Sequence, residues 1–170
     1  VNVNQTTFFN KSGGIYTNTG TFTIAAGKTL TISGGAPVFN QNGGTLTVSG
    51  SYTHNGTGTT VRGVLNLNGG TLGGTGAVGI TYGTLNVGLA SALTPSFLLI
   101  FGNLNLAPAA TGAAGFTMTG TGAISGNIAA GQTVWVQASG AGGPTVLTSA
   151  TGFTNAGTLR LESIDSAYDS

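Results

Sequence analysis

The chain has 170 residues with a formal net charge of +1, and only 4% of them are charged, against about 25% in an ordinary soluble domain. This near-neutrality gives no electrostatic basis for binding nucleic acid or an anionic membrane, and no stretch approaches the ~20 apolar residues of a membrane-spanning helix. Cysteine is absent, which excludes disulfides, whereas glycine contributes 32 residues. Because Thr suits pleated strands and Gly and Asn suit tight corners, the composition predicts many short strands and little helix.

The first residues, 1–19, are mainly polar, and we expect them to form a cap or a first irregular coil. The first clear strand is predicted over 21–24, where polar and apolar residues alternate with period two. Such alternation places the apolar side chains on one face of a strand and the threonines on the other. After a corner at 25–28 the alternation returns over 29–32, which indicates a second side of the same coil.

A short phrase then recurs, in which a glycine is followed by polar, apolar, polar and apolar residues. Its copies begin at Gly20, Gly44, Gly63, Gly83, Gly102 and Gly157. The steps between the four central copies are 19, 20 and 19 residues, and self-similarity at a fixed period predicts stacked coils. Neighbouring strands in such a stack lie about 4.8 Å apart and satisfy each other's backbone hydrogen bonds.

The period also predicts which apolar side chains lie above one another in the interior. One expected column contains Leu46, Leu65, Leu85 and Leu104, and the other contains Val48, Leu67, Val87 and Leu106. Fully burying one such side chain stabilises the fold by roughly 1.5–3 kcal/mol, so several columns offset the ordering entropy of a glycine-rich chain. The expected fold class is therefore all-β, a single-stranded parallel β-helix (β-solenoid) with coils of about 19–20 residues.

The expected solenoid spans residues 1–161. Residues 40–43 are expected to form a corner, and residues 138–144 a loop that leaves the rod. Beyond Leu106 the period weakens, and further strands are predicted within 116–118, 124–128, 133–136, 146–147 and 158–161. Residues 162–170 are the only acidic stretch, which we interpret as a tail or a linker to a following unit. The chain has no initiator Met and no signal peptide, so we interpret it as a segment of a longer protein.

The run Phe97-Leu98-Leu99-Ile100-Phe101 breaks the alternation because all five residues are apolar. One interpretation is a strand packed on both faces, as burial of large apolar side chains would favour. The other is an exposed apolar patch or a subunit interface.

The phrase Phe39-Asn40-Gln41-Asn42-Gly43-Gly44-Thr45-Leu46-Thr47-Val48 resembles the repeats of filamentous-haemagglutinin-like and autotransporter-passenger proteins, the β-helical stalks of large bacterial secreted proteins. Similar phrases occupy 67–76 and 153–161, and the likeness covers most of 13–161. The resemblance implies a right-handed parallel β-helix, export through an outer membrane, and a role in adhesion or as a surface spacer. It also implies a stalk without enzymatic activity of its own.

Acidic side chains are confined to Glu162, Asp165 and Asp169, so residues 1–161 contain no carboxylate. Glycoside hydrolysis uses two carboxylates that flank the bond, and calcium sites use carboxylate oxygens. His54 is the only histidine, which leaves neither a metal-ligand set nor a catalytic triad. We therefore expect no enzyme activity, no cofactor, and no catalytic, cofactor-binding or metal-binding residue.

The remaining polar and aromatic candidates have ordinary interpretations. His54 is interpreted as a turn residue, and Lys11, Lys28, Arg62 and Arg160 are interpreted as solvated surface charges. Four aromatic residues either fill core corners and cap coils or stack on sugar rings: Tyr16, Tyr52, Tyr82 and Trp135. The sequence leaves these two alternatives open.

The leading functional hypothesis is a structural or adhesive stalk segment of a secreted or surface-displayed bacterial protein, located extracellularly or on the cell surface. Its expected partners are a host-surface, glycan or cell-surface ligand, and unpaired coil ends favour end-to-end or lateral self-association unless a cap covers them. One alternative is ice or ordered-surface binding through outward threonine pairs. These pairs are Thr21 and Thr23, Thr29 and Thr31, and Thr45 and Thr47. A less favoured alternative is a carbohydrate-active β-helix enzyme.

Overall fold

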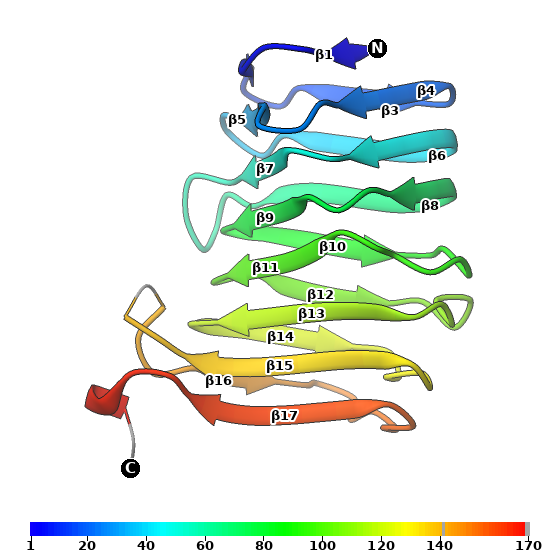
Figure 1. Cartoon of the computed structure of the whole chain (residues 1–170). Helices are drawn as coiled ribbons and strands as arrows, with labels where there is room; N and C mark the ends of the chain where they lie inside the picture. The colour runs from blue at the N-terminus through cyan, green and yellow to red at the C-terminus, as the bar shows by residue number, and fades with distance from the viewer. Residues whose placement is uncertain (141, 169–170) are drawn as a thin grey trace.

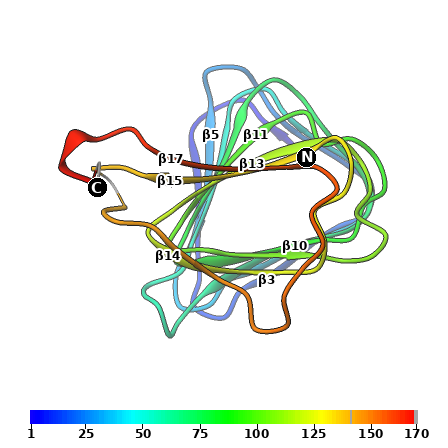
Figure 2. The ribbon, with the colours of Figure 1, turned by 90° about the horizontal axis from the view of Figure 1, so that it is seen from below.

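The computed structural model describes residues 1–140 and 142–168, and it is an all-β solenoid of about seven turns. Parallel strands stack down the rod, and the first and last strands of the chain lie at opposite ends of the stack (Figure 1). In Figure 1 strands such as β13 (Ala114–Thr119) run to the left in front, and strands such as β12 (Asn103–Leu106) run to the right behind. Because the chain descends as it winds, the coil is right-handed (Figures 1 and 2).

The strands form three faces, which we name after a characteristic residue. The tryptophan face contains β2 (Thr7–Asn10), β5 (Thr29–Ser33), β7 (Ser51–Asn55), β9 (Ala77–Thr81), β11 (Ser96–Ile100), β13, β15 (Gln132–Ala138) and β17 (Thr158–Ser163). The asparagine face contains β3 (Ile15–Asn18), the first halves of β6 (Val38–Val48) and β8 (Gly63–Gly73), β10 (Gly83–Val87), β12, β14 (Thr121–Ser125) and β16 (Val146–Thr148). The threonine face contains β1 (Asn2–Val3), β4 (Thr21–Ile24) and the second halves of β6 and β8. A short 3-10 helix, η1 (Ser166–Tyr168), follows β17.

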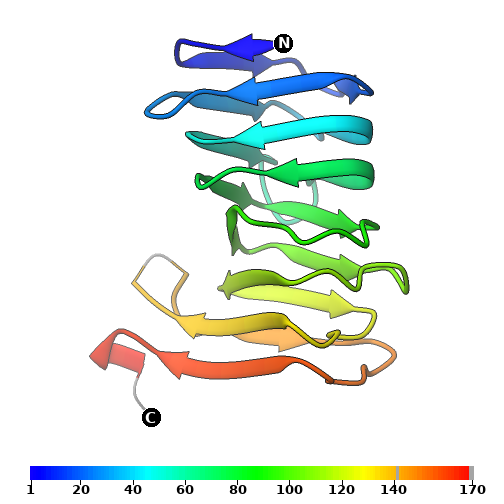
Figure 3. The same cartoon turned by 45° about the vertical axis from the view of Figure 1, so that its right-hand side comes forward.

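The threonine face lies in the N-terminal part of the rod. It forms there because β6 and β8 each continue around a corner from the asparagine face, and their second halves add a further strand to each coil. Figure 3 shows both strands folding back at the edge of the stack, β6 in cyan and β8 in green. The corner falls at Gly44 and Gly70, whose φ angles are 62° and 79°, a region that glycine enters without strain. A Cβ on Gly44 would also collide with the carbonyl oxygen of Gly20 in the coil above.

The expected corner at 40–43 is therefore only partly correct. Asn40 and Gln41 continue the strand, and the register shifts begin after Gln41. These residues belong to β6, which bends at Gly44, so its first half lies on the asparagine face and its second half on the threonine face.

The bend also explains why the first interior columns differ from the expected ones. Leu65, Leu85 and Leu104 are direct neighbours in register, as predicted. Leu46 instead pairs with Phe22 and Leu72 on the threonine face, and Phe39 lies above Leu65.

The second column shows the same correction. Leu67, Val87 and Leu106 are neighbours in register, whereas Val48 pairs with Ile24, and Gln41 lies above Leu67. The step from Gly44 to Gly63 therefore matches the period of the repeat without being one turn of the coil.

Coil lengths follow from the number of faces. Stacked asparagines in the C-terminal coils are 20 and 19 residues apart, as predicted, whereas Asn40 and Asn66 are 26 residues apart. The additional residues build the extra strand on the threonine face and the loop between β7 and β8.

One continuous hydrophobic cluster fills the interior from Val3 to Val136. The tryptophan face contributes two inward columns, one of which runs from Leu30 through Tyr52, Val78, Phe97 and Phe116 to Val134. The other runs from Ile32 through His54, Ile80, Leu99 and Met118 to Val136. Each coil therefore packs on the next throughout the described rod.

The apolar run at 97–101 keeps the ordinary alternation of a strand. Phe97 and Leu99 point into the core, whereas Leu98 is 41% exposed on the outer side. Phe101 ends the run with a φ of 51° and stacks on Tyr82 of the preceding coil, with ring centroids 5.2 Å apart. Within this run only Leu98 is an exposed apolar side chain, and one such side chain does not amount to a patch.

The terminal segments join the stack as strands. Residues 1–19 contain β1, β2 and β3, and β17 continues to Ser163 before η1. Residues 139–140 and 142–145 lie in the excursion between β15 and β16, where Ser139 and Gly143 make an antiparallel bridge. This excursion projects from the side of the rod (Figure 1).

Candidate functional site

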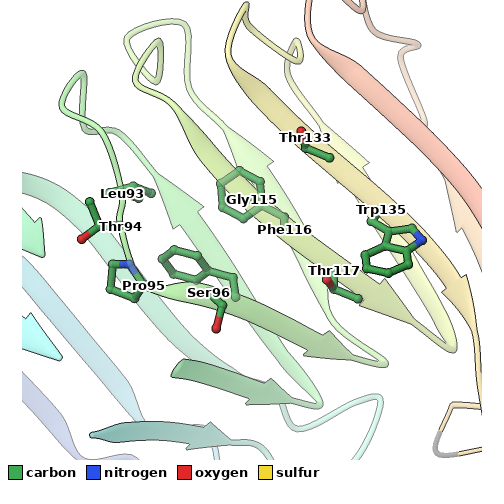
Figure 4. A pocket seen from close by; sticks show the side chains of 10 residues that line it. Leu93, Thr94, Pro95, Ser96, Gly115, Phe116, Thr117, Thr133 and Trp135 are labelled. Carbon is green, nitrogen blue, oxygen red and sulfur yellow. The ribbon is translucent and has the colours of Figure 1, made fainter. Parts of the chain in front are cut away.

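The outer side of the tryptophan face carries a groove, with a volume of about 290 Å³, over β11, β13 and β15. Figure 4 shows Thr94 and Pro95 on one side, Trp135 on the other, and Gly115 between them. We call this feature the tryptophan groove. Because Gly115 has no side chain, and a Cβ placed on it would meet no atom within 4 Å, the floor of the groove is open at this position.

Hydroxyl groups surround this floor. Ser96 lies on β11, Thr117 on β13 and Thr133 on β15, and all three line the groove together with Thr94. Alternation along each strand brings them to the outer side, while Phe97 and Phe116 lie beside them and point into the core. The lining is therefore uncharged, with hydroxyls around an apolar base.

Trp135 forms the wall of the groove towards the C-terminal end of the rod. It is in register with Thr117 on β13 and with Arg160 on β17. The Arg160 guanidinium carbon lies 4.5 Å from the indole centroid, and Arg160 also forms an ion pair with Glu162 at 2.6 Å. The cation therefore holds the ring from the β17 side and is itself neutralised, while the groove lies on the β13 side.

The asparagine face carries a ladder of side-chain amides on its outer side. Asn66, Asn86 and Asn105 each donate from Nδ2 to Oδ1 of the asparagine in the preceding coil, at 2.8, 2.6 and 2.6 Å. Asn40 is the first acceptor, and Ser125 donates to Asn105 Oδ1 at 2.8 Å. A second groove of about 280 Å³ runs beside the ladder. The ladder ties consecutive coils together outside the hydrophobic core.

His54 lies on β7 with its side chain in the interior of the solenoid, so its interpretation as a turn residue is wrong. The side chain is fully buried, with Nε2 3.0 Å from the Pro37 carbonyl oxygen and Nδ1 2.9 Å from the Tyr52 hydroxyl. A neutral ring that donates from Nε2 and accepts at Nδ1 satisfies both contacts. Burial lowers the pKa of His54 to about 4, although the hydrogen bond to Pro37 acts in the opposite direction. His54 is therefore a neutral structural residue.

The other aromatic candidates divide between core and corner positions. Tyr52 is buried, and burial raises its pKa well above the usual value of 10. Tyr16 stacks on Phe9 with centroids 5.2 Å apart, and Tyr82 stacks on Phe101. Of the four aromatic candidates, Trp135 lines the tryptophan groove.

The basic residues do not gather into one site. Lys11 is exposed and Lys28 is half-buried, and they lie in different coils. Arg62 was expected to be a solvated charge, but it is half-buried and donates from Nη1 to the Phe101 carbonyl oxygen at 2.6 Å. Its role is structural because it crosses to a later coil.

The carboxylates lie near the C-terminal end of the rod. Glu162 is on β17 and Asp165 follows it, whereas Asp169 lies outside the described residues. Among residues 1–140 and 142–168, no group of three or more His, Cys, Asp or Glu side chains could hold a metal ion. Over the same residues, no helix has the length and hydropathy needed to cross a bilayer.

The threonine pairs occupy two different faces. Thr21, Thr45 and Thr71 are in register on the threonine face, and Thr71 donates to Thr45 at 3.3 Å. Thr29 and Thr31 lie on β5 of the tryptophan face. The threonine column is therefore short, since the threonine face ends with β8.

Sequence reasoning identified Trp135 as a candidate but missed the groove beside it. The groove depends on which residues of β11, β13 and β15 share a register, and the repeat phrase is lost in that part of the chain. The asparagine ladder was detectable, because the phrase places Asn at the same position in three consecutive copies.

No family model matches the chain, and no curated protein or solved structure matches it.

Proposed function

We propose that the chain is a non-catalytic stalk segment of a secreted or surface-displayed bacterial protein, with a spacer and an adhesive role. One observation carries this proposal: the hydrophobic core is a single continuous cluster along the rod, so each coil is stabilised by its neighbours. Such an architecture holds its outer faces at fixed spacing over a long distance, which suits a spacer. The likeness of its repeat phrases to filamentous-haemagglutinin-like and autotransporter-passenger stalks supports the surface location.

The chemistry of the outer faces supports a role in contact rather than in catalysis. The outward side chains on the three faces are mostly Thr, Asn, Ser and Gly, with little charge. The two described carboxylates lie at the C-terminal end of the stack, and Glu162 already pairs with Arg160. Hydroxyls and amides at regular spacing form many weak hydrogen bonds to a polar surface, and repeated weak contacts add up through multivalency.

Fusing the chain to an outer-membrane anchor and displaying it on a non-adherent bacterium tests the proposal. We expect displayed cells to attach to polar or glycan-coated surfaces more than cells that carry the anchor alone. A tandem duplication of the chain should move a terminal epitope further from the cell, as seen by electron microscopy. Attachment no greater than that of the anchor alone would refute the adhesive role, and an unchanged epitope distance would refute the spacer role.

A further inference from the structure

We propose that the tryptophan groove binds a neutral saccharide, with one sugar ring held between Trp135 and Thr94. The inference deepens the adhesive role proposed above, on which it rests, by assigning its ligand class and its place on the rod. It is argued from the groove over β11, β13 and β15 and from Arg160 and Glu162 on β17.

The size of the groove selects a small ligand. Its volume of about 290 Å³ lies just below the roughly 300–1,000 Å³ that is typical of small-molecule sites. That space accommodates about one ring and leaves the rest of a longer chain on the surface. The open floor at Gly115 is what creates the space, since the neighbouring outward positions carry side chains.

The lining selects a ligand with apolar and hydroxylated surfaces. Trp135 presents an apolar ring surface on one side of the groove, and the exposed Thr94 bounds the other side, where Pro95 is buried (Figure 4). Ser96, Thr117 and Thr133 surround it with hydroxyls that both donate and accept hydrogen bonds. A pyranose ring matches this arrangement, because its C–H faces are apolar and its edge carries hydroxyls.

The electrostatics select a neutral sugar. None of the lining residues is charged, and the nearest cation, Arg160, lies on the β17 side of the indole and pairs with Glu162. An acidic sugar would lose hydration without gaining a free counter-charge. The indole nitrogen points away from the groove in Figure 4 and is enclosed, so the ring contributes its apolar surface to the ligand.

Arg160 also prepares the site before the ligand arrives. A cation over an indole face is attractive, and it restricts the rotamers of the ring. Because a fixed aromatic wall loses little conformational entropy on binding, the groove is preorganised on this side.

The test uses the purified chain and a defined panel of oligosaccharides. The neutral members are built from glucose, galactose, mannose or N-acetylglucosamine, and the acidic members are oligogalacturonates and heparin fragments. Trp135 is the only tryptophan, so its fluorescence reports the groove directly during each titration. We expect saturable binding of at least one neutral oligosaccharide and no binding of the acidic ones.

Two variants locate the binding. Gly115→Val fills the floor without a steric clash, because a Cβ there meets open space, and valine suits a strand. Trp135→Ala removes the wall. Each change should weaken binding at least about tenfold, as truncation of an aromatic anchor commonly does, while far-UV circular dichroism stays unchanged. Isothermal titration calorimetry replaces fluorescence for Trp135→Ala.

Gly79→Val is the matched control. Gly79 lies on the outer side of β9 on the same face, and the nearest atom to its Cβ position is 4.0 Å away. This variant should bind as the natural chain does. The proposal is overturned if no neutral oligosaccharide binds, if only acidic ones bind, or if Gly115→Val binds unchanged. A folded rod that attaches displayed cells without binding the panel would remove the saccharide site and leave the proposed stalk function standing.

Discussion

Lowering the pH should destabilise this protein through His54. The ring is fully buried and neutral between Pro37 and Tyr52, and its pKa is lowered from 6.5 to about 4. Between these two values the unfolded chain binds a proton that the folded chain does not. Stability is therefore fully present above about pH 6.5, falls as the pH drops, and levels off below about pH 4.

The magnitude follows from the size of the shift. A difference of about 2.5 pKa units at about 1.36 kcal/mol each corresponds to a loss of about 3 kcal/mol. For a domain with a typical unfolding free energy of about 5–15 kcal/mol, this is a large fraction. Urea denaturation at a series of pH values from 8 to 3.5, followed by circular dichroism, measures the loss.

His54→Leu is the matched variant for this prediction. It removes the titrating group and keeps an apolar side chain in the column between Ile32 and Ile80. It should be less stable at neutral pH, because the Tyr52 hydroxyl and the Pro37 carbonyl lose their partner, but it should lack the loss of about 3 kcal/mol that His54 causes between pH 6.5 and 4. The reasoning fails if the natural chain is equally stable at pH 7 and pH 4.5, or if the imidazole NMR signal titrates near 6.5.

Three further perturbations address the ladder, the corner and the threonine face. Asn86→Ala breaks two ladder bonds, to Asn66 and from Asn105, and should cost about 1–3 kcal/mol by urea denaturation; a loss within error would show that the ladder does not couple the coils. Gly44→Ala places a Cβ against the Gly20 carbonyl at a φ of 62°, and should lower the unfolding free energy by more than about 2 kcal/mol; an unchanged melting temperature would contradict the bent form of β6. Because the threonine column ends at Thr71, the purified chain should show no thermal hysteresis in an ice-growth assay, whereas measurable hysteresis would favour ordered-surface binding.

The sequence predicted the solenoid because its repeat phrase carries both signals of a stacked strand. Period-two alternation placed Leu65, Leu85 and Leu104 inside, and the spacing of 19–20 residues placed them above one another. When the period is constant, backbone pairing between parallel strands leaves little choice of register. The stacking of β8, β10 and β12 therefore follows directly from the phrase.

The first coils could not be placed in the same way. The period of 19 residues from Gly44 to Gly63 coincides with the later repeat, yet β6 bends at Gly44 and joins two faces. The local sequence hides the first half of β6, because Val38-Phe39-Asn40-Gln41 lacks the polar–apolar alternation of the second half and its inward Gln41 is polar. Register with the preceding coil places the first half beside β3 and the second half beside β4, and both halves pair with β8.

The candidate site was only partly accessible to sequence reasoning, for a similar reason. Trp135 stood out as the single tryptophan, but its exposure depends on the strand's phase and on Arg160 in the next coil. The open floor at Gly115 is invisible in sequence, since glycine is frequent throughout the chain. His54 was misassigned because its polar neighbours indicate a turn, whereas its burial depends on Tyr52 supplying a hydrogen bond within the core.

Cysteine cross-linking tests the stacking of the coils most directly, and the chain contains no native cysteine to interfere. Asn66 and Asn86 are direct neighbours in register, and Asn105 lies one coil further along. Neighbouring strands lie about 4.8 Å apart, within the Cα separation that a disulfide spans, whereas two coils are about twice as far apart. Mild oxidation should therefore cross-link Asn66→Cys with Asn86→Cys, and Asn86→Cys with Asn105→Cys, but not Asn66→Cys with Asn105→Cys. Failure of both adjacent pairs, or cross-linking of the distant pair alone, would contradict the parallel stack.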